Sequence, residues 1–207
     1  MNIISPYKDV EQYTRIKILP HQLNSDIRNH MKLNLKKKVE KKCNKNGFID
    51  NVYKITGYRD GVMTPENLSG IVIYDVSYHC KMCIPIENSV IIAQVKLVSS
   101  DLIIGQNGPI VIFISRDNID TNVWDIEENF LHKEMKERLK INKFIKVEII
   151  AKKINNGDHQ IKTIGRLLDY ASNEETEKYY GSIIQLEDKE DEKEEEEDNK
   201  DDSNFII

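Results

Sequence analysis

The stretch VIIAQVKLVSSDLIIGQNGPIVIFIS, residues 90–115, decides the fold of the second half of the chain. It holds three short runs rich in β-branched residues, which predict strands at 90–95, 101–105 and 110–115. A Gly-Pro pair separates the second run from the third, as is typical of a turn between strands. Three strands in close succession indicate the first part of a small barrel.

Two further strands are predicted downstream, at 144–154 and 159–168. The turn between them reads Asn-Asn-Gly-Asp, and an Asn-Gly pair between β-rich runs is a strong hairpin signal because both residues tolerate positive φ. Three strands, a connecting segment and a closing hairpin, all within residues 86–172, are the layout of an OB-type barrel. Such barrels bind extended nucleotides, so nucleic acid is the first functional hypothesis, although small barrels also serve unrelated functions.

The connecting segment, residues 117–142, is longer than a turn. Its apolar residues recur at helical spacing between Glu127 and Lys140, among interleaved glutamates and lysines. We therefore expect a short helix at 127–140, inserted into the barrel.

The first 85 residues predict an α+β domain, a small antiparallel sheet with one covering helix. The helix has an apolar residue at every fourth position and a basic opposite side, which fits a solvated surface or, alternatively, a phosphate-binding one. The expected elements are a strand at 14–19, a helix from Asn24 or Ser25 to about Lys42, and strands at 48–56 and 71–86, with a turn at Asp60-Gly61.

Charge is spread unevenly along the 207 residues, whose formal net charge is −5. Residues 1–85 carry an excess of lysine and arginine, residues 86–172 are balanced, and residues 173–207 are strongly acidic. We therefore expect three parts with these bounds, the last of them a disordered tail, because so charged a segment buries too little apolar surface to fold. Its end, Phe205-Ile206-Ile207, is either a frayed terminus or a short docking motif.

Composition also bounds the cellular setting. No early segment resembles a signal peptide, and no apolar run reaches the roughly 18 residues of a membrane span. Cys43, Cys80 and Cys83 are too few and too unevenly spaced for a disulfide framework. We expect a soluble, intracellular, reduced protein with no membrane partner.

Catalytic and metal chemistry find little support in the sequence. Cys80 and Cys83 have the spacing of a thiolate pair, but structural zinc needs four ligands, and residues three apart on a strand face opposite sides. Buried core cysteines are the favoured interpretation. There is no phosphate-binding glycine loop, no Gly-x-Ser-x-Gly and no magnesium-binding aspartate set, so we expect no catalytic residue, no metal and no cofactor.

Considered together, the two halves resemble the stalk subunit of multisubunit DNA-directed RNA polymerases, the eukaryotic seventh-subunit and archaeal E-subunit family. The resemblance covers residues 14–172 and rests on the order and spacing of short motifs more than on any one of them. These motifs are Ile18-Leu19-Pro20, Gly47-Phe48-Ile49, Asp60-Gly61, Tyr74 to Tyr78, Ile84-Pro85-Ile86, Gly108 to Ser115, and Ile164-Gly165-Arg166-Leu167.

The resemblance implies a non-catalytic subunit that docks on the polymerase core through a tip loop and holds its barrel near nascent RNA. It also implies a second stalk subunit as a candidate partner. The implied docking residues are Tyr58, Arg59, Asp60, Gly61, Val62 and Met63. The residues expected to contact RNA, if the barrel does so, are Lys96, Arg116, Lys152 and Arg166.

The chain departs from this family where bases would stack. Many such barrels carry an aromatic residue on the second strand, whereas Val98 to Ile103 has none, and losing a stacking residue costs about 1–3 kcal/mol per base. Because the barrel is also neutral, RNA contact is expected to be weak.

The alternative interpretation is a free-standing single-stranded RNA-binding protein with an OB-type barrel. The basic excess lies on residues 1–85 and not on the barrel, which favours docking over autonomous binding. The composition fits an AT-rich eukaryote or a large DNA virus, and the unusual barrel favours the virus. The expected location is the nucleus for a cellular protein, and the host cytoplasm and virion for a viral one.

Overall fold

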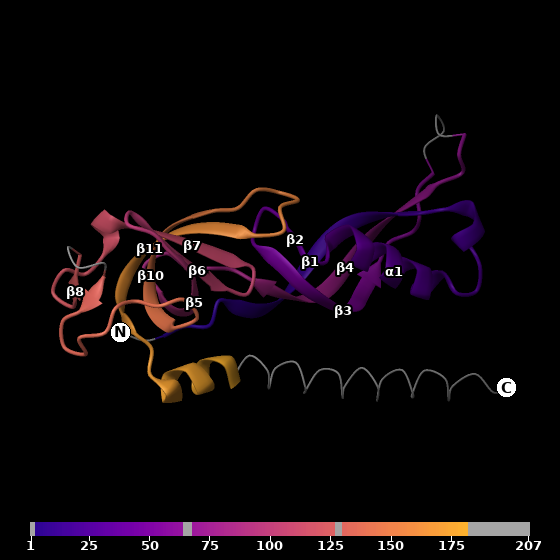
Figure 1. Cartoon of the computed structure of the whole chain (residues 1–207). Helices are drawn as coiled ribbons and strands as arrows, with labels where there is room; N and C mark the ends of the chain where they lie inside the picture. Colours follow the sequence, from indigo (N-terminus) through magenta and orange to yellow (C-terminus); the bar gives the residue numbers. More distant parts are fainter. Residues whose placement is uncertain (1–2, 64–67, 127–129, 182–207) are drawn as a thin grey trace. The chain divides into compact units, whose positions relative to one another are not determined.

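A computed structural model describes residues 3–63, 68–126 and 130–181 of the chain (Figure 1). The chain divides into two compact units. We call Tyr7–Ile84 together with Asn155–His159 the sheet unit, and the remaining described residues the barrel unit. In the described residues, no helix has the length and apolar character that crossing a membrane requires.

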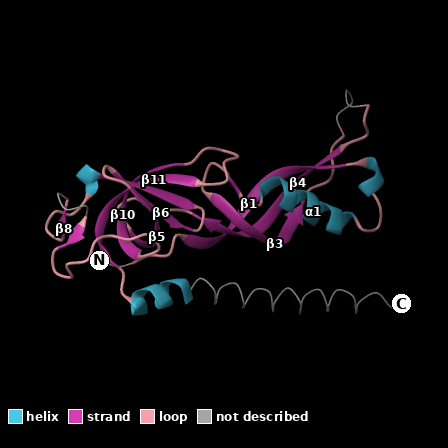
Figure 2. Cartoon of the chain, viewed as in Figure 1, coloured by secondary structure: helices cyan, strands magenta, loops and turns pink. Residues whose placement is uncertain are grey.

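The sheet unit is a four-stranded antiparallel sheet, in the order β1-β4-β3-β2, with one α-helix on one face (Figure 2). The helix buries Met31 and Leu35 in the same core as Ile16 and Val76 of the strands. The elements are β1 (Tyr7–Ile18), η1 (Pro20–Gln22), α1 (Ile27–Val39), β2 (Lys42–Cys43), β3 (Phe48–Tyr58) and β4 (Val72–Cys83).

β1 is longer than the strand expected at 14–19, because its polar first half pairs fully with β4. The two strands stay in register from Tyr7 opposite Cys83 to Ile18 opposite Val72. Alternate residues face opposite sides, so Ile16 joins the core under α1 while Arg15 lies on the uncovered face. The pairing with β4 thus extends a strand that its own sequence only partly specifies.

The barrel unit contains a closed five-stranded barrel, as predicted. Its strand order is β10-β11-β7-β6-β5; the β11–β7 pair is parallel and the other pairs of the barrel are antiparallel. The connectivity fits an OB-type barrel. The strands are β5 (Val90–Val98), β6 (Leu102–Asn107), β7 (Ile110–Ser115), β10 (Phe144–Lys153) and β11 (Ile161–Tyr170).

The segment between β7 and β10 differs from the prediction. Residues 130–140 contain no α-helix, so the helix expected at 127–140 is wrong there, and residues 127–129 lie outside the described part. Phe130 and Lys136 have φ values of 59° and 52°, which interrupt any right-handed helix. The segment forms η2 (Arg116–Asn118), β8 (Trp124–Asp125) and β9 (Leu131–His132) instead.

The end of the described chain also corrects the prediction. Residues 173–181 form a helix, so ordered structure continues past Ser172, where the disordered tail was expected to begin (Figure 1). The backbone N–H of Glu175 donates to Ser172 Oγ at 3.1 Å, and the Ser172 N–H donates to Glu175 Oε2 at 2.9 Å. This capping box starts the helix. Residues 182–207, with most of the acidic residues of the predicted tail and Phe205-Ile206-Ile207, lie outside the described part.

Candidate docking tip and nucleic-acid interface

The implied docking residues, 58–63, continue the hairpin of β3 and β4 in the sheet unit. The Arg59 N–H donates to the Asp75 carbonyl at 3.0 Å, and Val62 and Ile73 exchange two backbone hydrogen bonds of 2.9 Å. We call residues 58–63 the tip. Because backbone bonds tie it to β4, the tip is a fixed extension of the sheet.

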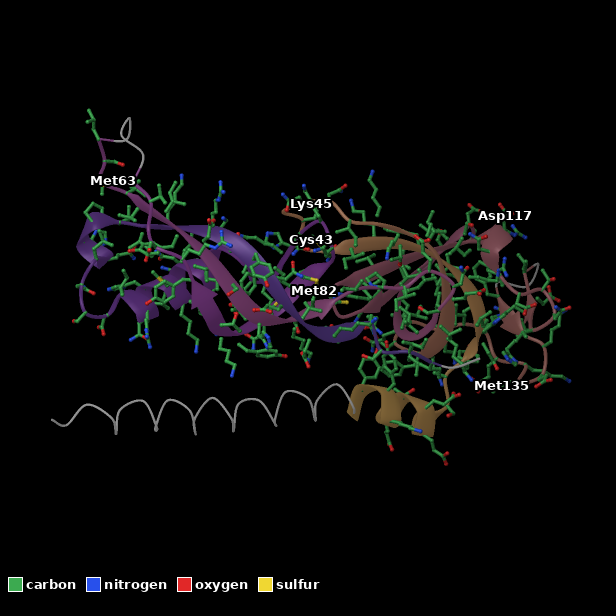
Figure 3. The ribbon with its side chains drawn as sticks, turned by 180° about the vertical axis from the view of Figure 1, so that it is seen from behind. Cys43, Lys45, Met63, Met82, Asp117 and Met135 are labelled. Carbon is green, nitrogen blue, oxygen red and sulfur yellow. The ribbon has the colours of Figure 1, made fainter. Side chains whose placement is uncertain are left out.

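Apolar side chains of the tip are exposed. Val62 is 61% and Met63 52% exposed, and Figure 3 shows Met63 beyond the ends of the strands of the sheet. Tyr58 packs edge-on against Tyr74, with ring centroids 6.2 Å apart. Exposed apolar side chains that form a contiguous patch with a polar rim are typical of interaction surfaces.

Gly61 lets the tip lie close against β4. A Cβ atom at this position would be 2.4 Å from Val72 Cγ1 and 2.6 Å from Tyr74 Cζ, too close for any side chain. Gly61, which belongs to one of the motifs that carry the resemblance, is therefore needed here because a side chain would collide with β4.

An open groove of about 510 Å³ adjoins the tip. Arg15 Nε donates to Asp75 Oδ1 at 2.9 Å within it, and Tyr13 is 76% exposed beside this ion pair. The groove therefore places the exposed Tyr13 ring next to the charged Arg15–Asp75 pair. Its other lining residues include Tyr58 and Arg59 of the tip.

The four basic residues expected to contact RNA are spread over four strands of the barrel unit. Lys96 lies on β5, Arg116 directly follows β7, Lys152 lies on β10 and Arg166 on β11. Arg166 Nη1 is 3.6 Å from Glu148 Oε2, and the Lys152 ammonium donates to the Pro85 carbonyl at 2.8 Å. The Lys96 ammonium donates to Gln94 Oε1 at 2.6 Å, so three of the four side chains are already engaged by the barrel unit itself.

Lys96 borders a groove of about 350 Å³ that sequence analysis did not identify. Phe144 of β10 and Tyr180 of helix 173–181 bring their rings together there, with centroids 5.6 Å apart and planes at 57°. Gln94 and Gln106 lie directly opposite each other in the β5–β6 register. We call this site the aromatic groove; it is lined by Gln94, Lys96, Gln106, Gly108, Phe144 and Tyr180.

Helix 173–181 is fixed to the barrel by polar contacts. The buried Tyr179 hydroxyl accepts a hydrogen bond from Asn107 Nδ2 at 2.8 Å, and the Lys146 ammonium pairs with Glu175 at 3.0 Å. The hydrogen bond from the Ser172 backbone, followed by Lys146, lowers the pKa of the Glu175 carboxyl. A Ser-x-x-Glu capping signal at 172–175 could have revealed this helix from sequence, but not where it packs.

The Tyr180 hydroxyl is neutral at physiological pH. Burial raises the pKa of Tyr180 to about 12, and the hydroxyl donates towards the Ile92 carbonyl at 3.4 Å. Tyr180 is half-buried, and it also packs edge-on against Tyr179 at 5.2 Å. Its ring is therefore held in one orientation beside the groove.

The three cysteines are free thiols in the core of the sheet unit. Burial, with a smaller contribution from Asp9, raises the pKa of Cys80 to about 12, so this thiol stays protonated. In the part of the chain that the structure describes, no three His, Cys, Asp or Glu side chains gather in a way that could hold a metal ion.

Fold and surfaces define a class: a small α+β sheet unit with an exposed tip, joined in one chain to an OB-type barrel. No known family profile matches the chain. It is 32% identical over 176 residues to "Putative DNA-directed RNA polymerase subunit L376" of Acanthamoeba polyphaga mimivirus, an alignment covering 84% of this chain and 88% of the viral protein. The chain belongs to this family of DNA-directed RNA polymerase subunits, which confirms the expectation of a polymerase subunit.

Proposed function

We propose that the protein is a non-catalytic stalk subunit of a DNA-directed RNA polymerase. The observation that carries the proposal is the 32% identity with the mimivirus polymerase subunit, which extends over 84% of the chain and thus through both units. A polymerase subunit assembles with other polymerase subunits. As a stalk subunit, the protein would attach to the core through its sheet unit and hold its barrel towards nascent RNA. A second stalk subunit is then a candidate partner.

The tip supports attachment by its chemistry. Tyrosine, arginine and methionine are enriched where protein interfaces concentrate their binding energy, and the tip presents Tyr58, Arg59 and Met63. Because the tip is already bonded to β4, docking requires little further ordering of its backbone. A rigid, partly apolar projection fits insertion into a pocket of the polymerase core.

The mimivirus relative favours a viral origin for this protein. For a viral protein, we propose that it is located in the host cytoplasm and in the virion.

Replacing a basic and an apolar side chain of the tip by aspartate tests the docking proposal. We expect the double variant Arg59→Asp/Met63→Asp to fold normally, because both side chains are exposed. It should lose co-purification with the polymerase, since it places two carboxylates in a partly apolar interface. The measurement is recovery of core subunits with tagged protein from the native cell.

The matched control is Arg28→Asp/Leu33→Asp on the exposed side of α1, which makes the same chemical change away from the tip. Retention of the tip variant in purified polymerase would overturn the docking proposal. Equal loss of both variants would assign the attachment to a broader surface than the tip.

The second candidate function is a free-standing single-stranded RNA-binding protein, favoured by the two aromatic rings beside Lys96. The same purification separates the two functions. A stalk subunit brings core subunits with it, whereas a free-standing protein brings RNA without them.

A further inference from the structure

We propose that helix 173–181 completes a nucleobase site on the barrel, in which Phe144 and Tyr180 stack a base of single-stranded RNA. The inference rests on the proposed function, because nascent RNA is the ligand that a stalk barrel would meet. It adds the location of the site and the source of the aromatic rings, which come from β10 and helix 173–181 and not from the second strand of the barrel.

The aromatic wall is the first argument. Phe144 and Tyr180 are both half-buried, pack against each other with ring centroids 5.6 Å apart, and line the groove. Tyr179 packs edge-on against Tyr180 and prevents its ring from turning away. Bases stack on such pre-oriented rings at low entropic cost, and every base has a face to stack.

The amide pair is the second argument. Gln94 Oε1 accepts from the Lys96 ammonium at 2.6 Å, which leaves the Gln94 amide nitrogen as a donor. Gln106 Nε2 donates to the Gly108 carbonyl at 3.1 Å, which leaves the Gln106 oxygen as an acceptor. One donor and one acceptor on opposite strand positions suit the polar edge of a base.

Charge and size fit one nucleotide. Lys96 is exposed at the rim of the groove, where its ammonium can meet a phosphate. The volume of about 350 Å³ is at the small end of ligand pockets, which suits a single nucleotide better than a folded RNA. With one cation at the site, binding should be weak and its salt dependence shallow.

Two amides and a lysine beside the rings favour a nucleotide over an apolar peptide as the occupant. An apolar segment covering this groove would displace water from a donor and an acceptor without replacing its hydrogen bonds, whereas a nucleobase can replace them.

The experiment uses the full chain and iodouridine-labelled single-stranded RNA, whose base cross-links to stacked aromatic residues on irradiation. We expect cross-links at Tyr180 or Phe144. Tyr180→Leu keeps apolar bulk against the barrel but removes the aromatic face, so affinity measured by fluorescence anisotropy should fall about tenfold. Tyr13→Leu, which removes an exposed ring of the sheet unit, is the matched control and should bind as the unmodified chain does.

Gln106→Leu is a second variant that leaves helix 173–181 untouched and should also weaken binding. Unchanged affinity in both Tyr180→Leu and Gln106→Leu would overturn the proposal, as would cross-links confined to the basic side of α1. Binding of a protein segment at the groove, seen as protection of Tyr180 without RNA, would overturn it too. Failure of the chain to co-purify with polymerase would contradict the stalk function but not the nucleobase site.

Discussion

Gly165 lies on β11 where neighbouring side chains occupy the space that a larger residue would need. A Cβ atom there would be 2.4 Å from Val147 Cγ1 and 2.8 Å from Ile112 Cγ2. The Gly165-Arg166 pair quoted for the polymerase resemblance thus has a packing reason in this chain. It allows β11 to pass between two branched side chains inside the barrel.

We therefore expect Gly165→Ala to lower the free energy of unfolding by about 1–3 kcal/mol, the usual cost of overpacking a core. Urea unfolding of the purified protein measures this change. Gly57→Ala is the control, because its nearest neighbour is the Ser77 hydroxyl at 3.2 Å, which can give way. A Gly165→Ala variant as stable as the control would mean that the barrel relaxes around the added methyl group.

Asn107 shows why some residue roles could not be predicted. In the sequence it precedes Gly-Pro and indicates only a turn. In the fold it is 1% exposed, and its Nδ2 donates both to the Ile92 carbonyl at 2.6 Å and to the Tyr179 hydroxyl at 2.8 Å. The second partner is 72 positions away, and no local pattern connects the two residues.

Removal of helix 173–181 should lower the stability of the barrel unit. It carries the buried Tyr179, the Lys146–Glu175 ion pair and the capping box at Ser172. Truncation after Ser172 exposes the barrel surface that Tyr179 covers, and burial of one large side chain is worth about 1.5–3 kcal/mol. We expect the melting midpoint to fall by at least about 4 °C, measured by circular dichroism.

Truncation after Gly181 is the matched control, because it keeps the helix and removes the acidic residues beyond it. Equal melting midpoints for the two truncated proteins would show that the helix does not stabilise the barrel. If residues 173–207 were a disordered tail throughout, as their composition predicts, truncation after Ser172 would cost no stability. Because helix 173–181 packs on the barrel, we expect truncation after Ser172 to lower stability and truncation after Gly181 to leave it unchanged.

Element predictions succeeded where the signals are local. Alternating β-branched residues at 110–115 and the Asn-Gly turn between 144–154 and 159–168 specify strands by themselves, and the closed barrel contains them. The helix predicted at 127–140 failed because distant contacts shape that segment. Trp124 Nε1 donates to the Leu168 carbonyl at 3.0 Å, and His132 Nε2 lies 3.0 Å from Asp169 Oδ1.

At the scale of the whole molecule, the two candidate sites differ in how far sequence could identify them. The tip is one continuous stretch between two strands, so its position along the sequence was enough to identify it as a candidate site. The aromatic groove draws Gln94, Gln106, Phe144 and Tyr180 from β5, β6, β10 and helix 173–181. Only the closed barrel brings them together, so the absence of an aromatic residue on the second strand could not reveal this groove.

Because the tip belongs to the sheet unit and the aromatic groove to the barrel unit, the two activities should separate in one assay. Arg59→Asp/Met63→Asp should lose recovery with the polymerase and still cross-link iodouridine RNA as an isolated protein. Tyr180→Leu should be recovered with the polymerase and lose the cross-link to nascent transcript in transcribing complexes. Loss of RNA cross-linking in the isolated tip variant would contradict this separation, because attachment and RNA contact would then depend on one shared surface.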